Sequence, residues 1–176
     1  GEGGAALRIA GEDATIRRSE FVGNHASGGT KEGHGGGAVW IEEGEARFVD
    51  CRFTENNLTA RVSRQGGAGV QVLKGSAQFE RCRFRGNSVY APRGEKPYHY
   101  AGGGAAYVLQ GRADFVGCRF ESNRAEVSSG NHGGGALYFY AAHATLTQCE
   151  FLDNEARQGH GGGVFQADGR ARLENC

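Results

Sequence analysis

Apolar residues along this chain alternate with polar ones in short runs, and similar runs return at a nearly fixed interval. The alternation is clearest in four segments whose first and third residues are always apolar: 39–42, 70–73, 106–109 and 137–140. A period of two predicts β-strands, in which successive side chains point to opposite faces. Helices are disfavoured because glycine runs precede these segments and no apolar i, i+3, i+4 stripe of useful length is present.

A second pattern, Cys-x-Phe-x-x-Asn, follows each strand segment, and its first copy has Ser19 in place of cysteine. The phenylalanines are 32, 31, 36 and 31 residues apart, a spacing typical of solenoid repeats. Stacking of such repeats places equivalent residues in columns, and we predict three structural columns. They are Cys51, Cys82, Cys118, Cys149 and Cys176; Phe21, Phe53, Phe84, Phe120 and Phe151; and Asn24, Asn56, Asn87, Asn123 and Asn154.

Each repeat reads as a glycine run, three short strands and a polar loop of variable length, which together make one coil of a parallel β-helix. The predicted fold class is all-β: a single-stranded right-handed parallel β-helix of about five and a half coils of about 31 residues, stacked about 4.8 Å apart. Residues 1–176 form one segment. Because the first residues enter a repeat without a cap and Cys176 ends one midway, we expect the segment to be uncapped at both ends and an excerpt of a longer chain.

The alternation of Gly-Gly-Ala-(Ile/Leu/Val), as in 35–39 and 133–137, with Phe-x-x-Asn resembles the repeats of chlamydial polymorphic membrane proteins and related bacterial and algal surface proteins. The resemblance extends over essentially the whole chain. It implies a secreted adhesin displayed outside the cell or on its surface.

The cysteine and asparagine columns have structural explanations. Cysteines in one interior column are expected to be small buried thiols, since parallel in-register neighbours present poor disulfide geometry. Thiolates about 31 residues apart in a straight column cannot surround one metal ion tetrahedrally. Asparagine tolerates left-handed backbone geometry, and stacked amides can bond along the column. We predict no metal site and no cofactor.

The outward side of the first strand carries aromatic residues, Trp40, Tyr107 and Tyr138, with Tyr140 beside them. A flat exposed aromatic stripe favours contact with a sugar ring or a partner protein. The alternative is cross-strand pairing that only stabilises the sheet surface.

Arginines share a second outward column, with two more close by in sequence: Arg52, Arg83 and Arg119, then Arg81 and Arg85. Like charges on neighbouring strands repel unless acids or an anion intervene. Two explanations stay open: a solvated charged face neutralised by Glu55 and Glu121, or contact with an anionic polymer.

The longest loop, 88–101, contains Tyr90, Tyr98 and Tyr100 and both prolines of the chain. Stiffened aromatic loops on a rigid scaffold often carry recognition. This segment is therefore the best single candidate for a specific contact, with loop drift as the alternative.

Histidines precede three glycine runs, at His34, His132 and His160. Solvated turn histidines are favoured over a two-histidine metal site, because no third ligand lies nearby in sequence. Asn57 begins a glycosylation sequon, placed in a loop.

Charge and motif content limit the function classes. Zero formal net charge gives no general case for nucleic acid, and no apolar run is long enough for direct membrane insertion. Acidic residues are spread along the chain without the facing carboxylate pair that glycoside hydrolysis needs. We therefore predict a non-enzymatic structural or adhesive protein with a protein or glycan partner. Alternatives are, second, a self-associating subunit of a filament, appendage or larger assembly and, third, a polysaccharide lyase or hydrolase.

Overall fold

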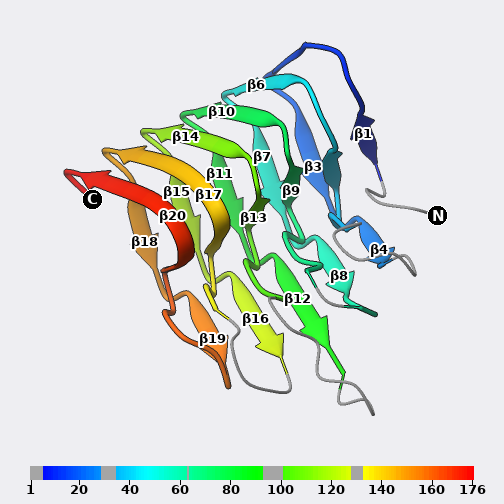
Figure 1. The fold of residues 1–176 in the computed structure, drawn as a ribbon, viewed down its shortest axis with the longest axis vertical. Helices are drawn as coiled ribbons and strands as arrows, with labels where there is room; N and C mark the ends of the chain where they lie inside the picture. Colours follow the sequence, from blue (N-terminus) through cyan, green and yellow to red (C-terminus); the bar gives the residue numbers. More distant parts are fainter. Residues whose placement is uncertain (1–5, 29–34, 63, 93–100, 128–132) are drawn as a thin grey trace.

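A computed structural model describes residues 6–28, 35–62, 64–92, 101–127 and 133–176. These residues form a right-handed parallel β-solenoid of about five turns, which confirms the predicted fold class. Every assigned element in the described ranges is a strand. Figure 1 shows the coils stacked from the N-terminal end to the C-terminal end, with equivalent strands of successive coils side by side.

Two strand ladders merge into one 10-stranded sheet. The first ladder contains β1 (Leu7–Ile9), β5 (Val39–Ile41), β9 (Val70–Leu73) and β13 (Ala106–Leu109). The second contains β2 (Ala14–Arg17), β6 (Glu45–Val49), β10 (Ser76–Glu80) and β14 (Arg112–Val116). In each of the last two coils a single long strand belongs to both ladders. These strands are β17 (Leu137–Thr147) and β20 (Val164–Glu174).

The Cys-x-Phe segments form a five-stranded sheet, which we call sheet B. It contains β3 (Glu20–Val22), β7 (Arg52–Thr54), β11 (Arg83–Arg85), β15 (Arg119–Glu121) and β18 (Glu150–Leu152), with β11 at its centre. All pairs are parallel and join equivalent residues, such as Phe53, Phe84 and Phe120. This register turns each repeat position into a column, as predicted.

A fourth strand per coil follows each asparagine, where the sequence analysis placed only a loop. These strands form another five-stranded sheet, sheet C: β4 (His25–Ser27), β8 (Asn57–Thr59), β12 (Ser88–Ala91), β16 (Arg124–Val127) and β19 (Glu155–Arg157). The loop prediction was wrong for these residues, including Asn57, because their inward side chains are mostly small apolar groups such as Ala26 and Ala125 that fill a narrow part of the core. The length variation lies after this strand.

Phenylalanine rings fill the core in two stacked ladders. The predicted column places Phe53, Phe84 and Phe120 face to face, with ring centroids 4.6 and 5.0 Å apart and planes 4° and 11° apart. A second column from the preceding strand stacks Phe79 on Phe115 at 4.7 Å. Phe79 also meets Phe84 edge to face at 5.6 Å. Such contacts add stabilisation beyond the burial of apolar area.

The asparagine column is a continuous hydrogen-bond ladder. Asn87 Nδ2 donates to Asn123 Oδ1 at 2.9 Å and to the Phe53 carbonyl at 2.8 Å. Asn87 Oδ1 accepts from the backbone N–H and Nδ2 of Asn56, at 3.1 and 2.9 Å. The predicted bonding along the column is confirmed. The left-handed residue at this turn, however, is the one before the asparagine, for example Gly86 at φ 63°.

The cysteine column consists of free thiols. Cys51, Cys82, Cys118 and Cys149 are buried, as predicted, whereas Cys176 is exposed. Cys82 Sγ lies 3.5 Å from the Phe48 carbonyl of the previous coil and 3.4 Å from the Glu80 carbonyl, so its single S–H is shared between these two acceptors. Burial raises the pKa of Cys51. The Cys149 and Cys82 thiols, together with burial, raise the pKa of Cys118. Cys51 and Cys118 therefore stay protonated thiols within hydrogen-bond distance of turn carbonyls.

Candidate functional site

The outer side of sheet B carries the predicted arginine column. The side chains of Arg83 and Arg85 point outward because Phe84, between them in β11, points inward and is fully buried. Arg83 pairs in register with Arg52 on one side and Arg119 on the other. Alternation within short strands and exact register between coils therefore bring the three arginines of the column together on one face.

The two outer arginines of the column, Arg52 and Arg119, form ion pairs with glutamates. Arg52 Nη1 lies 2.8 Å from Glu20 Oε1, and Arg119 lies 3.2 Å from Glu150 and 3.4 Å from Glu121. Neither Arg83 nor Arg85 makes an ion pair with any residue that the structure describes. The centre of the face thus has two exposed guanidinium groups that are not ion-paired with a carboxylate of the described ranges.

A shallow depression of about 340 Å³ lies over this face. Its lining consists of Arg52, Thr54, Arg83, Arg85, Arg119 and Glu121. The sequence analysis identified the arginine column but assigned no binding role to Arg85 or Thr54. The signal was available, since residues two apart in a strand share a face. Chemically, the depression offers guanidinium donors, one hydroxyl group and the Glu121 carboxylate, which is paired with Arg119.

The aromatic stripe on the outer side of the first strand was predicted to be exposed, and that prediction is wrong. Its register is present, with Tyr107 paired to Tyr138 and their rings stacked at 4.9 Å. Trp40, Tyr107 and Tyr138, however, are all 0% exposed. Tyr107 and Tyr138 belong, with Leu109, to a separate buried cluster on the outer side of the first strand, against which Tyr140 is partly buried.

Glycines explain why these rings are covered. A Cβ atom placed on Gly66 would lie 2.9 Å from Tyr107 Cδ1, and one on Gly102 would lie 3.2 Å from Tyr138 Cδ1. The chain that enters each coil therefore packs directly on the ring of the next coil, at a distance that only glycine permits. The glycine runs have this packing role in addition to their role in the turn.

Of the three tyrosines predicted for contact in the 88–101 segment, one lies in the described part of the chain. Tyr90 lies in β12 on sheet C and is 49% exposed, which makes it the most exposed aromatic side chain of the described ranges. Tyr98 and Tyr100 lie outside the described residues. Tyr90 remains a candidate contact. Its role in binding is a prediction that stands without a structural test.

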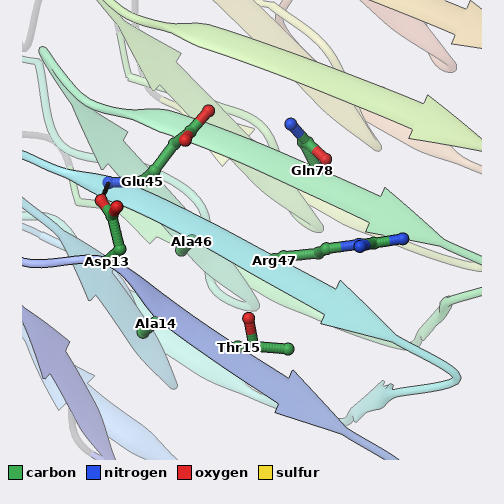
Figure 2. Close-up of a pocket in the computed structure, with 7 residues that line it drawn as sticks. All are labelled: Asp13, Ala14, Thr15, Glu45, Ala46, Arg47 and Gln78. Atoms are coloured by element: carbon green, nitrogen blue, oxygen red, sulfur yellow. Dashed lines mark hydrogen bonds between the residues drawn. The ribbon is translucent and has the colours of Figure 1, made fainter.

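A second depression, of about 200 Å³, lies on the outer side of β2, β6 and β10. Figure 2 shows Asp13, Thr15, Glu45, Arg47 and Gln78 along its walls. Asp13 Oδ1 accepts a hydrogen bond from the Glu45 backbone N–H at 3.2 Å. Arg47 is paired with Glu80 outside the depression. Local bonds thus engage both the Asp13 carboxylate and the arginine here, which makes this depression the weaker candidate.

Histidine and metal candidates find little support. His160 is exposed, and its backbone pairs with Gly133, so it continues the glycine ladder. His34 and His132 lie outside the described residues. Within the described ranges, no three His, Cys, Asp or Glu side chains are grouped so that they could hold a metal ion. Nor does that part of the chain contain a helix that could cross a membrane.

Comparison with known proteins identifies the family. The family model described as "Right handed beta helix region" matches residues 3–176. The chain belongs to this family. No curated protein and no solved structure matches the chain. The right-handed β-helix family contains both enzymes and non-enzymes, so membership supports the architecture while the activity has to be argued from the side chains. The closer likeness to polymorphic membrane proteins stays a prediction.

Proposed function

We propose that this β-helix is a non-enzymatic structural or adhesive segment of an extracellular, surface-exposed protein. The observation that carries the proposal is the composition of the interior, where side chains serve packing and hydrogen bonding between coils. Inward columns in the described coils consist mainly of phenylalanine and aliphatic side chains, thiols bonded to carbonyls and asparagines bonded to each other. These groups stabilise stacking, and the buried polar residues among those described are asparagines and glutamines, with no buried carboxylate for acid–base chemistry.

The outer surface supports the same proposal. The carboxylates of Glu20, Asp50 and Asp114 are each within 3.0 Å of an arginine nitrogen. Arg81 donates to Asp50 and holds the pKa of that carboxyl below its usual range. A glycosidase instead needs one carboxyl group with a raised pKa opposite a second, ionised one. The surface groups thus match a binding face better than a hydrolytic site.

Two assays of the same purified chain test this proposal. A panel of glycans and extracellular proteins, presented to the immobilised chain, should yield at least one saturable binding partner. A panel of polysaccharides incubated with the chain should yield no new reducing ends and no unsaturated products. Release of either product would contradict the non-enzymatic proposal, and absence of any binding partner would contradict the adhesive one.

A further inference from the structure

The centre of sheet B has an unbalanced charge pattern. In the first outward column the sequence of residues across the sheet is Glu20, Arg52, Arg83, Arg119 and Glu150. The acids lie on the outer strands, where they pair with Arg52 and Arg119. Arg83, on the central strand, has an arginine on both sides.

The neighbouring outward column does not correct the imbalance. There Arg85 lies between Thr54 and Glu121, and the Glu121 carboxylate is 3.4 Å from Arg119. Glu55, which the sequence analysis offered as a neutralising acid, makes no ion pair within the described ranges. Cross-strand like charges are destabilising, so the central guanidinium groups favour an additional anion, which no described residue supplies to Arg83 or Arg85.

The chemistry of the depression selects the kind of anion. A guanidinium group presents a planar fork of donors that matches the two oxygens of a carboxylate or the oxygens of a sulfate. Strand spacing of about 4.8 Å places Arg52, Arg83 and Arg119 in regular steps along the solenoid axis. A linear polymer with repeated anionic groups fits such a row. Thr54 adds a hydroxyl group that can bond with sugar hydroxyls.

The same depression is a poor match for other macromolecules. Protein interfaces depend on aromatic or aliphatic anchors in buried pockets, and no large apolar side chain lines this depression. Nucleic-acid surfaces are usually extended and strongly basic, whereas this chain has a formal net charge of zero. A small row of cationic groups on a chain without net charge corresponds better to a single polysaccharide strand with anionic groups at regular steps.

We propose that the outer face of sheet B binds an acidic polysaccharide, with Arg83 and Arg85 holding its carboxylate or sulfate groups. The polymer lies across the strands, along the solenoid axis, and Arg52, Arg119 and Thr54 line its path. This inference rests on the proposed adhesive function and gives it a ligand class. It also assigns a binding role to Arg85.

Binding measurements on the full 176-residue chain test the inference. The probes are polygalacturonate, dextran sulfate and neutral dextran. The variants are Arg83→Ala, Arg85→Ala and the double variant, and the matched control is Arg112→Ala, which removes one exposed arginine on β14 that is paired with Asp114. Charge-assisted hydrogen bonds of this kind imply roughly a tenfold or larger rise in Kd for each single variant. Arg112→Ala should bind as the original chain does.

A conservative variant and salt sharpen the result. Arg83→Lys keeps the charge but loses the fork, so it should bind more weakly than the original chain and more tightly than Arg83→Ala. Affinity should fall as ionic strength rises, because the exposed charges are screened. Denaturant unfolding of each variant, with midpoints equal to that of the original chain, shows that a binding loss is not an unfolding effect.

Several results would overturn the inference. Equal losses in Arg83→Ala and Arg112→Ala would reduce the site to general charge attraction. Unchanged binding in the double variant would place the ligand elsewhere. Tighter binding of a poly-glutamate peptide or single-stranded DNA than of both acidic polysaccharides would contradict the ligand class. Binding only to proteins or neutral dextran would also defeat the inference but leave the proposed adhesive function standing, whereas cleavage of a probe would contradict that function itself.

Discussion

The outward columns of two strand ladders follow the same alternation but have different surroundings. Tyr107 in β13 and Arg83 in β11 both point away from the central core. The tyrosine is fully buried by further chain packed on it, whereas the arginine is exposed. Alternation determines the side of the strand on which a residue lies. Whether that side meets solvent depends on what covers it, and here glycine runs next to one ladder provide the cover.

The largest expected contrast is between the two sides of β11. We expect Phe84→Ala to lower the free energy of unfolding by about 4–5 kcal/mol, since a ring stacked on both sides is replaced by a cavity. Arg83→Ala should change it by no more than about 0.5 kcal/mol. Urea unfolding followed by circular dichroism measures both. Similar losses for the two variants would show that the outer face of sheet B is not a free surface.

The outer side of β13 should respond like a core. Tyr107→Ala is expected to cost about 3 kcal/mol, within the range for large aromatic deletions. Tyr90→Ala, on the exposed face of β12, is the control and should stay within about 0.5 kcal/mol. The same unfolding measurement applies. If Tyr107→Ala were as mild as Tyr90→Ala, the aromatic column would be a surface stripe after all.

The asparagine ladder should show a smaller but clear effect. Asn87→Ala removes four hydrogen bonds and leaves the Phe53 carbonyl and the Asn56 amides without these partners in a buried site. We expect a loss of about 2–3 kcal/mol. Asn57→Ala, one residue after the ladder and only half-buried, should cost less than about 1 kcal/mol. Equal costs would indicate that the ladder is no stronger than a surface bond.

The thiol column should have the smallest effect on the free energy of unfolding, and that effect should depend on pH. Folding raises the pKa of the Cys51 and Cys118 thiols, so their protonated forms are favoured in the folded state. This contribution to the free energy of unfolding is complete below the unfolded pKa of about 8.5 and is lost as the pH rises toward the folded pKa values.

Thiol labelling tests the burial of the column. At pH 8, iodoacetamide should rapidly label one thiol, Cys176, and Cys176→Ser should remove that fast phase. Rapid labelling of Cys82 or Cys118 in the folded protein would contradict the buried column.

The structural columns could be predicted because the repeat contains all their information. A fixed interval between cysteine, phenylalanine and asparagine implies stacking, and stacking implies columns. The sequence analysis therefore identified the arginine face through the column of Arg52, Arg83 and Arg119. The lack of an acid paired with Arg83 depends on side-chain geometry, since Glu55 and Glu121 each follow an arginine of the column closely in sequence, yet only Glu121 makes an ion pair among the described residues.

Two other features depend on packing that one repeat does not reveal. The fourth strand, as in 57–59, is only three to four residues long. Its one or two inward side chains, several of them alanine, are a weak signal for a strand, and its pairing arises from the neighbouring coils. The burial of Tyr107 depends on Gly66, which comes from a different coil. Sequence reasoning about one strand at a time treats such a ring as exposed.

Protection of arginines from chemical modification tests the central claim most directly. It compares the arginines of sheet B with other exposed arginines in one protein, without any amino-acid substitution. The chain would be treated with phenylglyoxal, with and without a bound acidic polysaccharide, and the modified residues would be identified by mass spectrometry. We predict that the polymer protects Arg83 and Arg85 and leaves the exposed Arg112 and Arg172 as reactive as before. Equal protection of all four arginines, or protection of Arg112 and Arg172 alone, would contradict a binding face on sheet B.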